Sequence, residues 1–179
     1  MRSKRVRILG WAGISAVVLL ALAGFVWVRM FHDYPPAELA QDLRAGIAVR
    51  EIKDPDERFQ KYLEHRYGSM SEAANRQKAF LDFFHADHIR ALQFMVKHSP
   101  AAQRQANIKA SADWIAKYRA TMTAQERAAL NAQLQSATGK AMLKKATAQY
   151  NSQDVYYRGN TAPVISQLLT TLHEIQKPH

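Results

Sequence analysis

The sequence predicts an all-α protein, with a single N-terminal transmembrane helix followed by a multi-helix extracytoplasmic bundle. Two observations lead to this fold class. An uncharged apolar stretch follows a basic N-terminus, and residues that favour helix starts divide the rest of the chain. The sequence also lacks sustained β-branched alternation and the Asn-Gly or Asp-Gly pairs of tight hairpins. At 179 residues, the chain has room for about one ordinary domain.

The first predicted element is a membrane anchor at residues 8–31. Residues 1–7 form a basic tail, and residues 8–28 carry no charge. About 20 apolar residues are enough for a helix to cross the hydrocarbon core of a bilayer. The basic residues before the apolar stretch predict a cytoplasmic N-terminus. We therefore expect a single-pass protein of the inner (cell) membrane, with residues 32–179 forming a helical periplasmic, or otherwise extracytoplasmic, domain.

A cleaved signal peptide is the alternative to a retained anchor. Ala21 and Ala23 provide the small residues that a cleavage site before Gly24 requires. The apolar run nevertheless continues through residues 25–28, where a polar stretch would be expected after cleavage. The retained anchor is therefore the favoured interpretation, and cleavage after Ala23 stays open.

Small residues gather on one side of the predicted anchor. At about 100° per residue, Gly10, Gly13, Ala21 and Gly24 fall close together around a helix. Small residues let transmembrane helices approach one another closely. This membrane packing face predicts a membrane-protein partner or self-association within the lipid bilayer.

Composition excludes several classes of function. The chain has no cysteine, so it forms no disulfide, thiolate metal site or cysteine nucleophile. Its net charge of +10 falls to +5 beyond residue 31, because five of the 25 Lys and Arg residues and none of the 15 acidic ones lie before that point. The remaining basic residues are interspersed with acidic ones, whereas nucleic-acid binding would require a basic cluster. We therefore expect no nucleic-acid partner.

Helix-start signals divide the rest of the chain into seven segments. An N-cap acceptor is followed by Pro at the next position, by Glu three residues later, or by both. These signals are Asp54 with Pro55 and Glu57, Ser69 with Glu72, Ser99 with Pro100, and Thr123 with Glu126. The expected helices are residues 36–49, 54–66, 70–98, 100–121, 123–135, 138–150 and 162–177. Short connections favour antiparallel neighbours in a bundle.

Two histidines, His85 and His88, lie among the apolar residues of the stretch at 80–98. If this stretch is one helix, His88 lies near the middle of its apolar face and His85 toward the edge, so neither is freely solvated. Histidines three residues apart share a face and could bind a metal or haem iron. A third ligand would have to come from elsewhere, and the candidates are His65, His98 and His173. Hydrogen-bonded core histidines are the favoured interpretation, with metal binding and pH sensing as the alternatives.

A polar, aromatic segment at residues 150–163 is expected to connect the last two helices. Gly159 begins a stretch that resembles a turn followed by a helix start. Tyr156, Tyr157 and Arg158 are residue types that often anchor protein–protein contacts. They are therefore a possible partner contact, although tyrosines folded back onto the bundle are the simpler interpretation.

Catalytic signatures are missing from the sequence. It has no Gly-x-Gly-x-x-Gly, Walker loop, Gly-x-Ser-x-Gly or His-Glu-x-x-His motif. We therefore expect a non-catalytic single-pass membrane subunit or assembly (scaffold) protein whose helical domain docks on other proteins outside the cytoplasm. No cofactor and no small-molecule substrate is inferred. The alternatives are a sensor or chaperone-like binding module, and a small metal- or haem-binding helical protein that uses His85 and His88.

Overall fold

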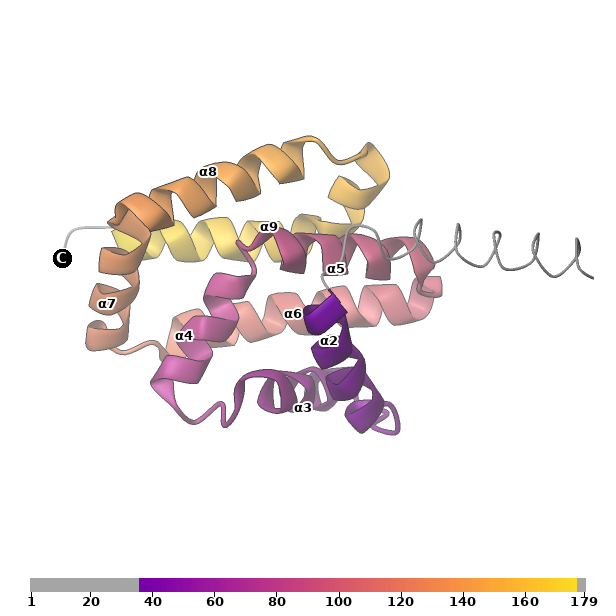
Figure 1. Ribbon diagram of the computed structural model, residues 1–179. Helices are drawn as coiled ribbons and strands as arrows, with labels where there is room; N and C mark the ends of the chain where they lie inside the picture. The colour runs from indigo at the N-terminus through magenta and orange to yellow at the C-terminus, as the bar shows by residue number, and fades with distance from the viewer. Residues whose placement is uncertain (1–35, 177–179) are drawn as a thin grey trace, which may run out of the picture. The chain divides into compact units, whose positions relative to one another are not determined.

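The computed structural model describes residues 36–176, with side chains from residue 41 onward (Figure 1). These residues form eight α-helices and no strand, which confirms the all-α class. The helices are α2 (Pro36–Val49), α3 (Pro55–Tyr67), α4 (Ala73–Asp82), α5 (Ala86–His98), α6 (Ala101–Thr121), α7 (Ala124–Gln135), α8 (Ala137–Asn151) and α9 (Val155–Gln176).

Two of the predicted helix starts have the expected hydrogen bonds. The Asp54 carboxylate accepts from the Glu57 amide at 2.8 Å and caps α3. A full capping box starts α7: the Glu126 amide donates to the Thr123 hydroxyl at 3.2 Å, and the Thr123 amide donates to the Glu126 carboxylate at 2.9 Å. Both starts are confirmed.

The predicted capping box of Ser69 and Glu72 is wrong. Helix α4 begins only at Ala73, and its N-cap residue Glu72 makes no side-chain cap. Gly68 ends α3 with a φ of 97°, a backbone conformation that suits glycine. Ser69 instead accepts a turn hydrogen bond at its carbonyl from the Glu72 amide at 3.2 Å. The chain therefore needs a five-residue connection, 68–72, to turn from α3 into α4.

The predicted single helix over residues 70–98 is two helices. Three successive turn hydrogen bonds, from the amides of Phe83, Phe84 and His85 to the carbonyls three residues earlier, bend the chain between α4 and α5. The bend leaves both phenylalanines buried, at 3% and 7% exposure. In a straight helix these consecutive side chains would point about 100° apart, so one of them would face away from the core. A turn allows both to be buried.

The predicted loop at residues 150–163 is largely helical. Helix α9 begins at Val155, because the Asp154 carboxylate accepts from the Tyr157 amide at 2.7 Å. The helix continues through Pro163. Proline has no N–H to donate to the carbonyl four residues back, which here belongs to Gly159. The start of α9 is therefore seven residues earlier than predicted.

Helices three apart in the chain stack on one another. Contacts join α3 with α6, α4 with α7, α5 with α8, and α6 with α9. In Figure 1, α3, α6 and α9 all run from right to left, and α5 and α8 return from left to right. The most extensive pairs, α6–α9 and α3–α6, are thus parallel, unlike the antiparallel neighbours expected from the short connections. The described chain is a helical bundle, an array in which contacts between helices three apart recur beside contacts between successive helices such as α7 and α8.

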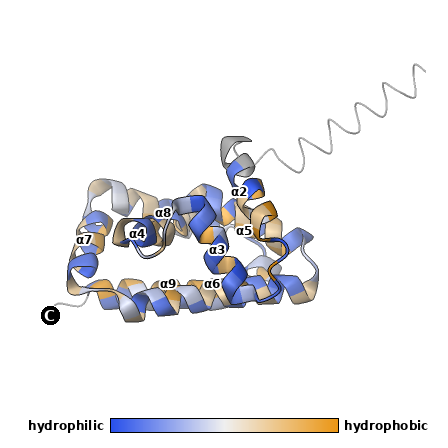
Figure 2. Cartoon of the chain, turned by 90° about the horizontal axis from the view of Figure 1, so that it is seen from below, coloured by the Kyte–Doolittle hydropathy of each residue, from blue (hydrophilic) through white to orange (hydrophobic). Residues whose placement is uncertain are grey.

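The core runs through this array. Its fully buried members include Phe80 of α4, Ile115 of α6, Leu130 of α7 and Val164 of α9, each at 0% exposure. Hydrophobic and hydrophilic residues alternate along the helices (Figure 2), so each helix has a buried and a solvated side.

None of the helices between Pro36 and Gln176 is long and apolar enough to cross a bilayer. The predicted anchor at 8–31 lies outside the described residues, and so does its packing face of Gly10, Gly13, Ala21 and Gly24.

Candidate functional site

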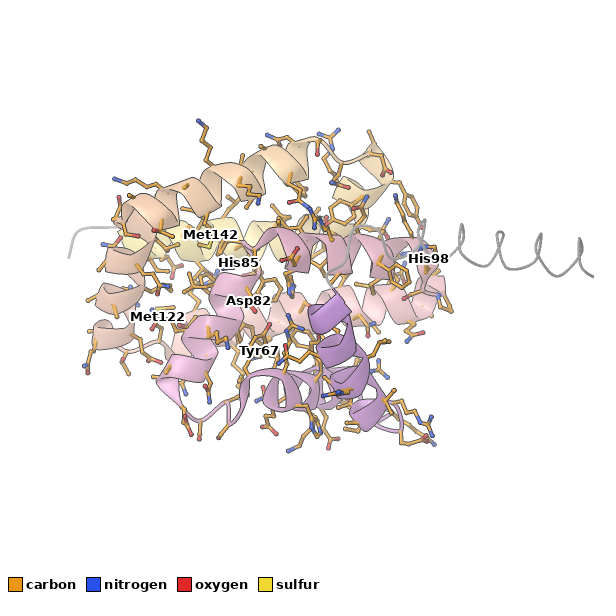
Figure 3. All side chains as sticks on the ribbon, in the orientation of Figure 1. Tyr67, Asp82, His85, His98, Met122 and Met142 are labelled. Carbon is orange, nitrogen blue, oxygen red and sulfur yellow. The ribbon has the colours of Figure 1, made fainter. Side chains whose placement is uncertain are left out.

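The bend between α4 and α5 places the two predicted histidines in different surroundings. His85 is the N-cap residue of α5 and is exposed, so the prediction that it is shielded is wrong. His98, a candidate for the third metal ligand, lies at the opposite end of α5 (Figure 3). Within residues 36–176, no three His, Cys, Asp or Glu side chains are grouped so that they could hold a metal ion.

His88 lies among apolar neighbours. Its ring centroid is 4.4 Å from that of Phe83, and its Nε2 atom is buried without a hydrogen-bond partner among the described residues. Burial, followed by the charges of Arg66 and His85, lowers the pKa of His88 to about 3. The imidazole is therefore neutral near pH 7, and Nε2 lacks the hydrogen bond expected of a core histidine.

The three predicted contact residues of the last connection lie on different sides of α9. Tyr157 is 1% exposed, and its hydroxyl donates to the Ile89 carbonyl at 3.4 Å. Tyr156 is 54% exposed, and the Arg104 guanidinium lies over its ring, 5.4 Å from the centroid. Arg158 is also exposed. Tyr157 thus folds back onto the bundle, and only Tyr156 and Arg158 remain accessible.

A groove of about 670 Å³ lies between α3 and α6, and we call it the α3–α6 groove. Helix α6 lines it with side chains spaced three or four residues apart, which is one face of a helix. The rest of the lining comes from the first turns of α3 and from the α3–α4 region. The lining residues are Asp56, Glu57, Gln60, Met70, Arg76, Ala110, Asp113, Trp114, Lys117, Tyr118 and Thr121.

Stacked aromatic rings support the middle of the groove. The rings of Trp114 and Tyr118 are 5.6 Å apart and nearly parallel, at 9°. Phe83 stacks on Trp114 at 6.2 Å, and Phe59 meets it edge-on at 6.5 Å. Trp114 and Tyr118 are 9% and 2% exposed. Rings packed in this way hold the floor of the groove rigidly.

The groove carries charges of both signs. Asp56 and Glu57, in the first turn of α3, and Asp113 of α6 supply carboxylates, although Asp113 is also hydrogen-bonded to Lys109. Lys117 of α6 is exposed. The groove therefore carries carboxylates near the start of α3 and, one turn of α6 beyond Asp113, the amine of Lys117.

Arg76 fixes the α3–α4 side of the groove. Its guanidinium donates to the Met70 and Ser71 carbonyls at 3.1 and 2.6 Å, and to the Glu126 carboxylate at 2.6 Å. Burial opposes the charge on Glu126, but hydrogen bonds from Thr123 and Arg76 lower the pKa of its carboxyl below the usual value. This ion pair ties the α3–α4 connection to α7 and leaves one side of the guanidinium at the groove.

The hydroxyl of Tyr118 is the unsatisfied polar group of the groove. It is buried and has no hydrogen-bond partner in the described part of the chain. Burial, and then the nearby Glu126 carboxylate, raises the pKa of Tyr118 to about 12, so the phenol keeps its proton. A buried hydroxyl without a partner costs free energy, about 1–3 kcal/mol. An acceptor from a bound molecule would remove that cost.

The described lining of the groove carries carboxylate, amine, guanidinium and hydroxyl groups. Its described lining contains no histidine, the commonest general base, and the Thr121 hydroxyl already donates to the Lys117 carbonyl at 2.9 Å. The sequence did not predict this site. Most of its lining comes from α3 and α6, and the sequence of neither helix indicates that the two pack in parallel. The spacing of Trp114 and Tyr118, one helical turn apart, was the only local signal.

Comparison with protein-family models, curated proteins and solved structures finds no match to this chain.

Proposed function

We propose that this protein is a non-catalytic, single-pass membrane protein whose helical domain binds a partner protein outside the cytoplasm, and that the α3–α6 groove receives a segment of the partner. One observation carries the proposal: the buried Tyr118 hydroxyl, which lacks a partner, lies on the aromatic floor of a groove of about 670 Å³. Native proteins leave few buried polar groups unsatisfied, so such a group in a groove points to a ligand.

The dimensions and charges of the groove favour a peptide segment. Its α6 side runs from Ala110 to Thr121, which is about 17 Å of helix at 1.5 Å per residue. Carboxylates near the start of α3 and the amine of Lys117 suit a segment with both a basic and an acidic side chain. Between them, a carbonyl of the segment would accept from the Tyr118 hydroxyl once the side chains that bury this hydroxyl move on binding.

The predicted anchor at residues 8–31 supports the proposed location of the protein in the membrane. Its uncharged run from residue 8 to residue 28 and the basic tail before it favour retention in the membrane, with the helical domain on the extracytoplasmic side. A groove held near a membrane meets membrane-bound partners at a raised effective concentration. The proposed role is therefore that of a subunit or assembly protein.

Site-specific photo-crosslinking in native membranes tests this proposal. A photoreactive amino acid replaces Lys117 in the groove or, as a control, the exposed Lys140 of α8. We expect a discrete adduct from position 117 and none of the same size from position 140.

Adding Tyr118→Phe should weaken that adduct without loss of stability, because the substitution deletes a hydroxyl that has no partner within the domain. Identical crosslinking patterns from the two positions would rule out the groove as the docking site. An adduct that is insensitive to Tyr118→Phe would remove the central observation.

A further inference from the structure

Helix α2 has two faces of different character. On one side, the Asp42 carboxylate accepts hydrogen bonds from Arg66 and from the Tyr62 hydroxyl, the latter at 2.7 Å. Ala45 and Val49, one and two turns further on, are buried at 3% and 4% exposure. This side attaches α2 to α3.

The other side of α2 exposes large apolar side chains. Leu43 is 54% exposed and Ile47 is 62% exposed, and they lie four residues apart, one above the other on the helix. Val155 and Tyr156, which are also exposed, are consecutive residues at the start of α9 and point about 100° apart. Among the described residues, α2 is therefore the helix in which large exposed apolar side chains line up on one face. We call Leu43 and Ile47 the α2 stripe.

The position of α2 in the chain restricts what can cover this stripe. Only residues 32–35 separate the predicted anchor at 8–31 from Pro36. Four extended residues span at most about 14 Å. If the anchor crosses the bilayer, α2 begins beside the membrane surface.

The charges around the stripe match a lipid surface. Arg44 and Arg50 of this segment are exposed, and Arg50 pairs only with Glu51 in a solvent-exposed ion pair that contributes little. The acidic Asp42 is on the opposite face and is neutralised by Arg66. Basic residues beside an apolar stripe are the signature of a helix that lies in the membrane interface.

We propose that the Leu43–Ile47 face of α2 lies in the headgroup region of the membrane, with both side chains reaching the acyl boundary. This inference rests on the anchor of the proposed function but not on the α3–α6 groove. The interfacial helix holds the helical domain at a fixed orientation to the bilayer, and the ion pair of Asp42 with Arg66 transmits that orientation to α3.

Fluorescent labelling of single cysteines tests this placement in the full chain, because the natural sequence has no cysteine. The variants are Ile47→Cys, Leu169→Cys and Val17→Cys, each labelled with an environment-sensitive dye and reconstituted into nanodiscs that contain anionic lipid. Leu169 of α9 is the matched control, since its side chain is 61% exposed, like that of Ile47. Quenchers attached to the lipid chains report contact with the membrane, and iodide reports contact with water.

We expect lipid-attached quenchers to reduce emission several-fold more at position 47 than at position 169, and iodide to act in the reverse order. Adding Leu43→Glu should reduce lipid quenching at position 47 without changing the thermal midpoint, because Leu43 is largely solvated in the domain.

Three results would overturn the inference, in two distinguishable ways. Quenching at position 17 with none at position 47 would leave the anchor standing and remove α2 from the membrane. Protection of position 47 from both quenchers would have the same effect, because it would mean that a partner protein or a second copy covers the stripe. No lipid quenching at position 17 would overturn the anchor and, with it, this inference.

Discussion

The α6–α9 pair and helix α2 are held in the domain by contacts of different kinds. Between α6 and α9, apolar side chains such as Ile115 and Val164 are completely buried. Helix α2 contacts the other helices much less: Ala45 and Val49 are buried, and Asp42 is hydrogen-bonded to Tyr62 and Arg66. The attachment of α6 to α9 depends mainly on removing apolar surface from water, whereas that of α2 depends in addition on a buried ion pair.

This difference determines how each attachment fails. Apolar burial is non-directional and does not depend on the ionisation of any group. A buried ion pair requires both partners, because the one that remains is an uncompensated charge out of water. Burial already raises the pKa of Asp42 despite its hydrogen bonds from Tyr62 and Arg66. The two regions should therefore respond differently to substitution and to acid.

The largest effect is expected from a cavity in the α6–α9 pair. Ile115→Ala should lower the free energy of unfolding of the whole domain by about 3–4 kcal/mol, because the side chain is fully buried. Chemical denaturation measures this loss. Leu169→Ala in α9 is the control, and a change below about 0.5 kcal/mol is expected there because Leu169 is exposed. Similar losses in both variants would contradict the assignment of the core.

A smaller, local effect is expected from breaking the ion pair of α2. Asp42→Ala leaves the Arg66 guanidinium buried without its carboxylate, at a cost of about 3 kcal/mol within α2 and α3. Amide hydrogen exchange should accelerate in α2 and stay unchanged in α9. Glu51→Ala, which removes an ion pair whose side chains are 71% and 87% exposed, should change neither. Equal acceleration in α2 and α9 would show that the two regions unfold together.

Acid should lower the free energy of unfolding of the domain through His88. Folding lowers the pKa of His88 from 6.5 to about 3. Between these two pH values, the unfolded chain binds a proton on His88 and the folded domain does not. The free energy of unfolding therefore falls as pH falls from 6.5 toward 3, by about 2 kcal/mol at pH 5.

His88→Leu should remove this part of the acid sensitivity and preserve or raise stability at pH 7, since an apolar side chain suits the site. Thermal unfolding between pH 7 and pH 4 measures the slope. His85→Leu changes an exposed residue and should keep most of the wild-type slope, because burial is the largest cause of the lowered His88 pKa and the charge of His85 is the smallest. A metal or haem present in the purified protein and lost in His88→Leu would overturn the core assignment.

The smallest effects come from glycines on helices. An added Cβ at Gly46 of α2 or Gly159 of α9 would meet nothing within 4 Å. Alanine at either position should favour its helix by about 0.5–1 kcal/mol. Gly159→Ala should raise the thermal midpoint of the domain, whereas Gly46→Ala should only slow hydrogen exchange in α2.

Gly139→Ala should instead destabilise the domain and serves as the contrast, because the added Cβ would lie 2.2 Å from the Gln133 carbonyl oxygen. The backbone of α7 would have to move, and we expect a loss of about 1–3 kcal/mol. If Gly46→Ala raised the midpoint as much as Gly159→Ala, α2 would be part of the same cooperative unit as α9.

The sequence predicted helices best where capping chemistry is local. The starts at Asp54 and Thr123 were correct because one side chain and one amide three residues later decide them. The break at Phe83–His85 has no proline or glycine to mark it, and it coincides with the burial of Phe83 and Phe84 in the connection between α4 and α5. At the start of α9, Gly159 and Pro163 were misread as loop signals while Asp154 supplied the cap.

The candidate site was not predictable in the same way. The sequence drew attention to His85 and His88, which are close in the chain, but the structure exposes His85 and buries the Nε2 atom of His88. The α3–α6 groove joins residues about fifty positions apart, such as Gln60 and Trp114. The stacking of helices three apart has no matching sequence repeat, because apolar side chains of many shapes serve equally well in such contacts.

The packing of helices three apart bears on how the chain folds as it is made. The two most extensive contacts, α3–α6 and α6–α9, join helices three apart, so the earlier partner has already been synthesised when the later helix emerges. Closing such loops costs little more than closing shorter ones, since the entropy grows only with the logarithm of length. The domain can therefore assemble in the order of translation, with α6 docking on α3 before α9 docks on α6. The docking of α9 is then the step that completes the core. Truncation before Val155 would expose Ile115 and the rest of the α6 face to solvent.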